Sequence, residues 1–358
     1  MTSVNQNVFN IHNLNLTFGN NKFQIENINN LSIREGEIVG VLGESGCGKS
    51  TFGKCLVGLI NERDKFRYNI ASIGNYEQES RIEFPLYPDI SFNKSTNVLS
   101  GSSKELRKYR KYVQMIFQNP RSSLNLSMPV NKILEEAVQL DTPDIGKSEL
   151  KIEVQNIADK FGIGGNNWDR IAASTPKDLS GGERRRLGIA KVFATNPDII
   201  IADEPVASLD VSVRGKILGT LYAEWENRKR EWEQGNILHP LTLIIISHDF
   251  DLIQKMAQRV IVFYGDIHVK RGTVVEIFAI DNLPKTMHPY TEQLRFDAEY
   301  MNSKPNSSVQ NKGLHRGKKI INNGCVYVNK CNYAQDQCFK DQPGLELKDN
   351  RRVACYEL

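Results

Sequence analysis

Apolar and polar positions alternate along the first part of the chain. Residues 11–42 follow this alternation, with a turn at Gly19–Asn21, and predict antiparallel strands that lead into the apolar run Glu37–Leu42. Residues 61–100 are polar and aromatic without a helical period, which predicts an irregular insertion with short strands. Both segments therefore predict β-structure, regular in the first and irregular in the second.

A helical spacing replaces the alternation in the middle of the chain. Residues 130–190 carry this spacing, for example at Ile133, Leu134 and Ala137. From position 199 to about 280, short apolar runs alternate with helical segments. That order is typical of a parallel sheet covered by helices, so the pattern predicts an α/β protein.

Composition narrows the class of protein. The 358 residues suffice for one large domain with an appendage or for two domains. The net charge of +4 balances 46 basic against 42 acidic residues without a long basic block, so we expect no nucleic-acid partner. No run approaches the roughly 18 apolar residues that span a bilayer. Met1–Asn10 lacks the basic start and apolar core of a signal peptide, and we expect the chain to stay in the cytosol.

A glycine-rich octet follows the first apolar run at once. Gly43–Ser50 reads Gly-Glu-Ser-Gly-Cys-Gly-Lys-Ser and fits the phosphate-binding pattern G-x-x-x-x-G-K-[ST]. The glycines let successive N–H groups turn inward around phosphate, Lys49 is expected to reach the β- and γ-phosphates, and the Ser50 hydroxyl is expected to bind Mg²⁺. Ser50–Ile60 is the expected helix whose N-terminus faces the anion. The residues expected to hold ATP here are Gly43, Ser45, Gly46, Gly48, Lys49, Ser50 and Thr51.

Two carboxylates end the apolar run Ile199–Ala202. Asp203 is expected to hold Mg²⁺ through water, and Glu204 is expected to act as the general base that polarises the attacking water. An Asp-Glu-Pro sequence after a strand is also a common way to begin a helix. The upstream phosphate loop is what favours the catalytic interpretation.

Five further landmarks resemble those of ABC ATPases and occur in the expected order. Leu179–Glu183 reads Leu-Ser-Gly-Gly-Glu and is similar to the signature LSGGQ. The others are Phe18, where an aromatic residue usually stacks on adenine, Gln118 of the Q-loop, Ser208–Asp210 of the D-loop and the switch histidine His248.

The resemblance covers residues 11–270 and implies a fold and a domain plan. A P-loop NTPase of the ABC type combines a RecA-like core sheet with an antiparallel β subdomain and a helical signature subdomain. We expect the ATPase domain over residues 1–285, with its helical subdomain over about 119–190. A small cysteine-rich C-terminal extension is expected over residues 286–358.

The resemblance also implies how these residues act. Ser180, Gly181 and Gly182 are implied to begin a helix and to offer N–H groups to the γ-phosphate of a nucleotide held by a facing subunit, so that the catalytic unit is a dimer. His248 is implied to donate to the γ-phosphate. Gln118 is implied to join the Mg²⁺ shell and to sense the permease.

Three positions need separate comment. Asp210 is placed with the nucleotide-binding residues through the D-loop. Phe18 fits a residue of a strand core as well as a stacking residue. Glu183 stands where the signature has glutamine, and a carboxylate near a triphosphate should repel it by up to about 1 kcal/mol if solvated. Arg184–Arg186 follow directly and are expected to offset that charge.

Two stretches indicate one branch of the family. Ile116–Asn125 resembles the Q-loop of oligopeptide and dipeptide importers, with Asn119 in place of the usual aspartate. His288–Leu294 resembles the His-Pro-Tyr-Thr motif that opens the C-terminal extension of that branch. The resemblance implies the D- or F-type ATPase subunit of a peptide importer, bound at the cytoplasmic face of the membrane. Its implied partners are a paralogous ATPase, two transmembrane permease subunits and a substrate-binding protein, and because nickel importers share the branch the cargo stays open.

Four cysteines crowd the end of the chain: Cys325, Cys331, Cys338 and Cys355. In a reducing cytosol such crowding favours metal ligation over disulfides. Four thiolates suit Zn²⁺, but the gaps here are wider than those of the usual zinc knuckle. Importers that this chain resembles carry iron–sulfur in the extension, so a [4Fe-4S] cluster is expected, with zinc or unconnected thiols as alternatives. Its expected role is structural, and the phosphate site is expected to form without it.

Two rival functions are weaker. A soluble ABC ATPase that acts on ribosomes or DNA usually has two cassettes or a long coiled coil. This chain has one cassette and 61 residues between Gln118 and Ser180 (positions 119–179), without sustained heptads. A catalytically silent regulatory partner would not need Glu204 and His248, which are both present.

Overall fold

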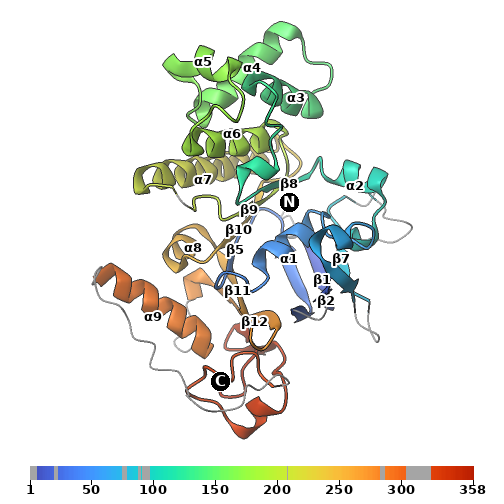
Figure 1. The fold of residues 1–358 in the computed structure, drawn as a ribbon, viewed down its shortest axis with the longest axis vertical. Coiled ribbons are helices and arrows are strands. Elements are labelled where there is room, and N and C mark those ends of the chain that lie inside the picture. The colour runs from blue at the N-terminus through green and yellow to red at the C-terminus, as the bar shows by residue number, and fades with distance from the viewer. Residues whose placement is uncertain are drawn as a thin grey trace. The chain divides into compact units, whose positions relative to one another are not determined.

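The computed structural model describes residues 6–19, 23–74, 79–87, 90, 97–207, 209–282, 287–303 and 324–358. The chain forms two compact units, one made of Met1–Ser103 with Ile245–Leu358 and the other of Lys104–Ile244 (Figure 1). Ser208, parts of the expected insertion and residues 304–323 lie outside the described residues.

Antiparallel strands open the first unit, as the alternating pattern predicts. One sheet has the order β4-β1-β7. Its strands are β1 (Asn7–His12), β4 (Leu31–Arg34) and β7 (Arg81–Glu83). In the second sheet β2 pairs antiparallel with both β3 and β6. Their bounds are Leu14–Phe18 for β2, Gln24–Ile28 for β3 and Ile70–Ile73 for β6.

The phosphate loop directly follows a buried strand of the second sheet. Strand β5 (Ile38–Leu42) is buried at every position and pairs parallel with β11 (Arg259–Asp266). Helix α1 (Lys49–Leu56) follows the loop and ends four residues before the expected limit at Ile60. Helix α8 (Phe250–Met256) packs on β5. The loop is therefore fixed between a rigid strand and a helix.

One part of the predicted parallel arrangement is different. Strands β11 and β12 (Arg271–Ala279) form an antiparallel hairpin instead of flanking a helix. Only positions 267–270 separate them, and a parallel connection needs a crossover of roughly a dozen residues or more. The apolar runs predict both strands correctly but do not predict how they pair.

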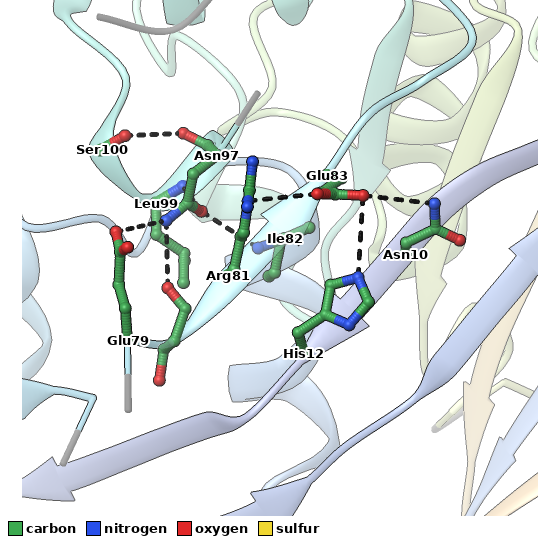
Figure 2. Close-up of polar contacts among 10 residues, drawn as sticks. Asn10, His12, Glu79, Arg81, Ile82, Glu83, Asn97, Leu99 and Ser100 are labelled. Atoms are coloured by element: carbon green, nitrogen blue, oxygen red, sulfur yellow. Dashed lines mark hydrogen bonds and ion pairs between the residues drawn. The ribbon is translucent and has the colours of Figure 1, made fainter. Parts of the chain in front are cut away.

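The expected insertion contains short ordered elements. They are the 3₁₀ helix η2 (Lys65–Tyr68), β6, β7 and the 3₁₀ helix η3 (Val98–Ser100). Asn97 ties η3 to β7, because its Oδ1 accepts the N–H of Ile82 at 3.0 Å and its Nδ2 donates to the Ser80 carbonyl at 3.0 Å. Figure 2 shows this contact beside Glu83, whose carboxylate meets His12 of β1. Polar side chains therefore hold η3 and β7 on the β4-β1-β7 sheet, whereas β6 joins the second sheet through β2.

The second unit is mainly helical, as the spacing over residues 130–190 predicts. Its helices are α3 (Val130–Asp141), α4 (Lys147–Lys160), α5 (Trp168–Ala173), α6 (Gly181–Ala194) and α7 (Val211–Glu233). Strand β8 (Val113–Ile116) pairs parallel with the fully buried β9 (Ile199–Asp203). Helix α2 (Ser103–Tyr109) and strand β10 (Thr242–Ser247) lie where the chain passes between the units.

The C-terminal part belongs to the first unit. Helix α9 (Pro289–Ser303) is followed, in the described residues, by η7 (Asp336–Phe339), β13 (Glu346–Lys348) and β14 (Arg351–Val353). Strand β14 pairs with both β13 and β12, so the tail joins the main sheet of this unit. Among the described residues, none of the helices combines the length and the apolar character that a bilayer crossing needs.

Candidate functional site

The phosphate loop has the backbone conformation that its glycines predict. Gly46 and Gly48 have φ values of 86° and 113°, which residues with a side chain rarely adopt. A Cβ on Gly43 would lie 2.1 Å from the carbonyl oxygen of Phe263 in β11, so the loop also approaches the sheet too closely for any other residue. A Cβ on Gly46 would meet nothing within 4 Å, because that edge of the loop faces open space. The loop is thus closed toward the sheet and open on the side where an anion can enter.

Lys49 is held against its own loop. Its side chain is buried, and the ammonium donates to the carbonyls of Gly43 and Glu44, each at 2.7 Å. Its residue begins α1, with Gly48 as the N-cap. An ammonium fixed by two carbonyls at the N-terminus of a helix is suited to bind phosphate, because the helix end and the ammonium both favour negative charge there.

Cys47 forms the underside of the loop. It is buried, and its backbone lies so close to Gly265 and Gly272 that a Cβ on either would approach Cys47 to within 3.0 Å. Burial raises the pKa of the Cys47 thiol, while nearby Lys49 opposes the rise. The residue therefore fills space as a neutral thiol and is not positioned as a nucleophile.

The two carboxylates expected to act on Mg²⁺ and water end strand β9 in the second unit. Asp203 is buried, and Glu204 adopts a left-handed backbone with φ of 48°. Such a conformation costs on the order of 1 kcal/mol for a residue other than glycine, so surrounding contacts must hold it.

Arg185 of α6 supplies those contacts. Its buried guanidinium donates to the carbonyls of Pro205 at 2.8 Å and Phe117 at 2.9 Å, and also to the carbonyls of Gln118 and Glu204. Burial lowers the pKa of Arg185 to about 10, and the charges of Asp203 and Glu204 oppose this, so the group stays charged at neutral pH. One side chain thereby fixes the backbone of the expected Q-loop glutamine and of the expected base. The sequence predicted that Arg185 offsets the charge of Glu183, whereas its guanidinium binds these carbonyls instead.

The signature-like segment begins helix α6. Ser180 is its N-cap, and its hydroxyl accepts the N–H of Glu183 at 3.2 Å while a carboxylate oxygen of Glu183 accepts the N–H of Ser180 at 2.8 Å. This is a capping box, so glutamate has a structural reason to stand where the signature has glutamine. The other carboxylate oxygen pairs with Arg170 at 2.6 Å. These contacts, first the Ser180 N–H, lower the pKa of Glu183.

The expected source of charge compensation was Arg184–Arg186. Arg184 instead donates to the carbonyls of Pro176 and Leu179, and Arg185 to the four carbonyls described above. The guanidinium that pairs with Glu183 is that of Arg170, on α5, thirteen positions away along the chain. The periodicity of the sequence does not predict this ion pair, because the loop between α5 and α6 sets the distance between Arg170 and Glu183.

The remaining predicted residues lie on well-defined elements. Phe18 ends β2, is half-buried and meets the ring of Phe23 edge-on at 6.0 Å. His248 is exposed just after β10, and Asp249 beside it caps α8. Asp210 is the N-cap of α7, where its carboxylate accepts the N–H of Val213 at 3.0 Å. The capping role of Asp210 is a structural reason for the residue, and its expected part in binding nucleotide stays a prediction.

The predicted residues divide between the two units. The first unit contains Phe18, Gly43, Ser45, Gly46, Gly48, Lys49, Ser50, Thr51 and His248, and the second contains Gln118, Ser180, Gly181, Gly182, Asp203, Glu204 and Asp210. Within the second unit, Arg185 brings the backbones of Gln118 and Glu204 together.

The four tail cysteines influence one another. Burial raises the pKa of Cys325 to about 12, with smaller contributions from Cys338, Cys331 and Cys355. The N–H of Cys325 donates to the carbonyl of Cys338 at 2.8 Å. Among the described residues, no group of three or more His, Cys, Asp or Glu side chains is placed to hold a metal ion. The thiols are thus near enough to interact but are not gathered around a single ion.

Comparison with known proteins agrees with this geometry. A family model described as ABC transporter matches residues 26–207. The oligopeptide transport ATP-binding protein OppF of Salmonella typhimurium is 31% identical over 340 residues, which cover 92% of this chain and 86% of the relative. The dipeptide transport ATP-binding protein DppF of Haemophilus influenzae is 30% identical over 330 residues, 91% of this chain and 86% of the relative.

Solved structures share the fold. The structure of cbiO1 from Clostridium perfringens, described as part of the ABC transporter complex cbiONQ, is similar with a TM-score of 0.54 and 22% identity over 83% of this chain and 95% of that one. The dimeric bacterial ABC transporter cassette MJ0796 is similar with a TM-score of 0.52 and 22% identity. The match covers 71% of this chain and 93% of that one. At these identities the likeness shows the α/β P-loop ATPase fold alone.

Proposed function

The chain belongs to the ABC transporter family of ATPases, and on that premise we propose that it hydrolyses ATP to power import of peptides through a membrane permease. The observation that carries the proposal is Lys49, fixed by two loop carbonyls at the start of α1, where a phosphate group can enter. The names of the relatives favour oligopeptides or dipeptides over nickel as cargo.

The proposed chemistry assigns each expected residue a task. Lys49 and the loop N–H groups bind the β- and γ-phosphates, and Phe18 offers a half-exposed ring for adenine. Glu204 takes the proton of the attacking water, and His248 donates to the γ-phosphate. Arg185 supports this arrangement, because it fixes the backbone that carries Glu204.

Asp203, Ser50 and Gln118 are the residues proposed to hold Mg²⁺. Asp203 is a buried carboxylate at the end of a strand, and Ser50 and Gln118 add a hydroxyl and an amide oxygen, which suit a hard cation. When bound, Mg²⁺ supplies neutralisation of the phosphate charge.

The proposed assembly follows the family pattern. Ser180, Gly181 and Gly182 begin α6 and serve the nucleotide of a facing ATPase subunit, which we propose is a paralogue. Two transmembrane permease subunits and a substrate-binding protein complete the importer, with this chain at the cytoplasmic face of the membrane. The proposed division of the chain is an ATPase domain over 1–285, containing a helical subdomain over about 119–190, and the extension over 286–358.

We also propose that the four tail cysteines hold a [4Fe-4S] cluster with a structural role. Their mutual influence on pKa supports a common site. The spacing of the four cysteines along the sequence, which is wider than that of a zinc knuckle, favours a larger group over zinc, because a cluster takes its thiolates at its corners. When bound, the cluster supplies cross-links for a tail too short to build its own core.

The experiment reconstitutes the chain with its permease and measures peptide-stimulated ATP hydrolysis and peptide uptake. Lys49→Ala should abolish both, because the phosphate ligand is lost. Lys54→Ala is the matched control: Lys54 lies on the same helix, with its ammonium over the ring of Tyr68. Stimulation by ribosomes or DNA instead of permease would overturn the proposal, and so would full uptake by the Lys49→Ala importer.

A further inference from the structure

The C-terminal part of the chain reaches the phosphate loop directly. The hydroxyl of Tyr290, in the first turn of α9, accepts the backbone N–H of Glu44 at 2.8 Å. Tyr290 is 2% exposed, and burial raises its pKa, so the hydroxyl stays neutral. The loop that is expected to bind phosphate is therefore anchored by a residue 246 positions away.

Tyr290 and Lys49 hold opposite edges of one peptide unit. The Glu44 N–H that donates to Tyr290 and the Gly43 carbonyl that accepts from Lys49 belong to the same planar peptide bond. In a trans peptide these two groups point in opposite directions, and no cis peptide bond occurs among the described residues. A rotation of this peptide that breaks one contact breaks the other. The position of the Lys49 ammonium is thus coupled to the tyrosine hydroxyl.

A chain of buried polar contacts connects Tyr290 to the tail. The N–H of Tyr290 donates to Nδ1 of His288 at 3.2 Å, and the N–H of His288 donates to Glu276 of β12 at 3.1 Å. Glu276 pairs with Arg351 of β14 at 3.0 Å, and the two side chains are 0% and 3% exposed. Burial lowers the pKa of His288 to about 3, so the imidazole is neutral and its ring nitrogen can accept. An ion pair in the tail therefore fixes the segment that presents Tyr290.

Aromatic packing makes a second connection. Tyr327 lies two residues after Cys325, and its ring meets that of Tyr290 at 5.6 Å and that of Tyr264 in β11 at 4.9 Å. The rings of Tyr264 and Tyr290 meet at 4.6 Å. The segment that carries the cysteines is thus packed against the tyrosine that holds the loop. The expectation that the phosphate site forms without the cluster stays a prediction.

We propose that Tyr290 is a positioning residue for the phosphate loop, and that the cysteine-rich tail sets the affinity for ATP through it. The proposal rests on the nucleotide site proposed above. Without the hydroxyl, the Glu44 N–H lies partly buried without its acceptor, and the peptide that orients Lys49 is held from one side only. The loop then samples conformations that do not bind ATP, which lowers the apparent affinity by the fraction of competent loop.

The test compares Tyr290→Phe with the matched control Tyr300→Phe, in the full chain purified anaerobically. Tyr300 lies on the same helix and its ring stacks on Phe296. We expect Tyr290→Phe to weaken binding of MgATP by about 3- to 10-fold, the usual effect of losing one hydrogen bond. The turnover at saturating ATP should stay within about twofold, because the base is untouched. The control should change neither.

A second variant tests the contribution of the tail. Tyr327→Ala removes the packing of the cysteine segment but leaves the Tyr290 hydroxyl in the chain. It should weaken MgATP binding in the wild-type background and much less in the Tyr290→Phe background, because the two changes act through one contact. Additive effects would overturn the role of the tail.

The outcomes separate this inference from the proposed function. Unchanged MgATP affinity in Tyr290→Phe, beside lost binding in Lys49→Ala, overturns the positioning role and keeps the nucleotide site. Tighter binding in Tyr290→Phe also overturns it, since the contact would then hold a loop that excludes ATP. Equal losses in Tyr290→Phe and Tyr300→Phe, together with lower unfolding temperatures, would show a merely structural effect. Binding that survives Lys49→Ala would remove the nucleotide site itself.

Discussion

Arg185 offers a sharp test of how the expected catalytic base is positioned. Arg185→Met keeps much of the side-chain volume and removes every donor. Four carbonyls lose a charged donor, those of Phe117, Gln118, Glu204 and Pro205. Hydrogen bonds from a charged group contribute roughly 1.5–3 kcal/mol each, but desolvation of the guanidinium costs several kcal/mol, so we expect a net loss of stability of about 1–3 kcal/mol.

The effect on turnover should exceed the effect on stability. The Glu204 backbone is strained at φ of 48°, and without Arg185 its carbonyl keeps the N–H of Ala207 at 3.2 Å but loses its contact with α6. A displacement of the base by about 1 Å costs on the order of 10²-fold in rate, so kcat should fall by about 10- to 100-fold. The affinity for ATP should change by less than about threefold, because the Lys49 loop is held by other contacts.

The assay is steady-state ATP hydrolysis in the assembled complex, with MgATP affinity measured on the same preparations. Arg184→Met is the matched control, since Arg184 lies next along α6 and donates to the carbonyls of Pro176 and Leu179. Arg185→Lys should give an intermediate rate, because a single ammonium keeps the charge but cannot span four carbonyls. Wild-type kcat in Arg185→Met, in a folded protein, would refute the reasoning.

Three further predictions follow from single groups. Glu204→Gln should lower hydrolysis by roughly 10²–10⁴-fold while ATP binding persists, and near wild-type hydrolysis would remove its role as base. Because the contacts of Ser180 and Arg170 lower the pKa of Glu183, its contribution to stability is complete above the ordinary value of 4.5 and is lost as the pH falls below it. Urea unfolding at several pH values should show a larger loss in the wild type than in Glu183→Ala, where carboxylates such as Asp178 still contribute. Anaerobic purification should give a brown protein with about four irons per chain, and Cys338→Ser should lower the iron content; a colourless protein with one zinc would replace the cluster.

Local signals predicted the parts of the site that depend on neighbouring residues. The buried run before Gly43 and the helix after Lys49 are both found, because strand, glycine turn and helix start are adjacent in the sequence. The helices over residues 130–190 are found for the same reason, since helical spacing is a local pattern.

The sequence patterns did not predict contacts between segments that are distant along the chain. The bond from Arg185 to Phe117 spans 68 positions, and the bond from Glu44 to Tyr290 spans 246. Neither pair leaves a periodic signal, because each depends on how strands and helices pack after they form. The β11–β12 hairpin shows the same limit. The apolar runs predict the two strands but not their pairing, and only the short connection between them indicates an antiparallel pair.

We expect the two positioning side chains, Tyr290 and Arg185, to affect different steps, because each forms hydrogen bonds with a different peptide group. Tyr290 holds the Gly43–Glu44 peptide, which orients the ammonium of Lys49, so its effect falls on the ground-state binding of ATP. Arg185 holds the carbonyl of Glu204, whose carboxylate is needed only when water attacks, so its effect falls on turnover. In both cases the residue that is expected to contact the nucleotide or water is oriented through main-chain groups, those of Gly43–Glu44 for Lys49 and its own carbonyl for Glu204, and the side chain that holds these groups comes from another element. The separation of affinity from rate is therefore a consequence of which peptide each side chain holds.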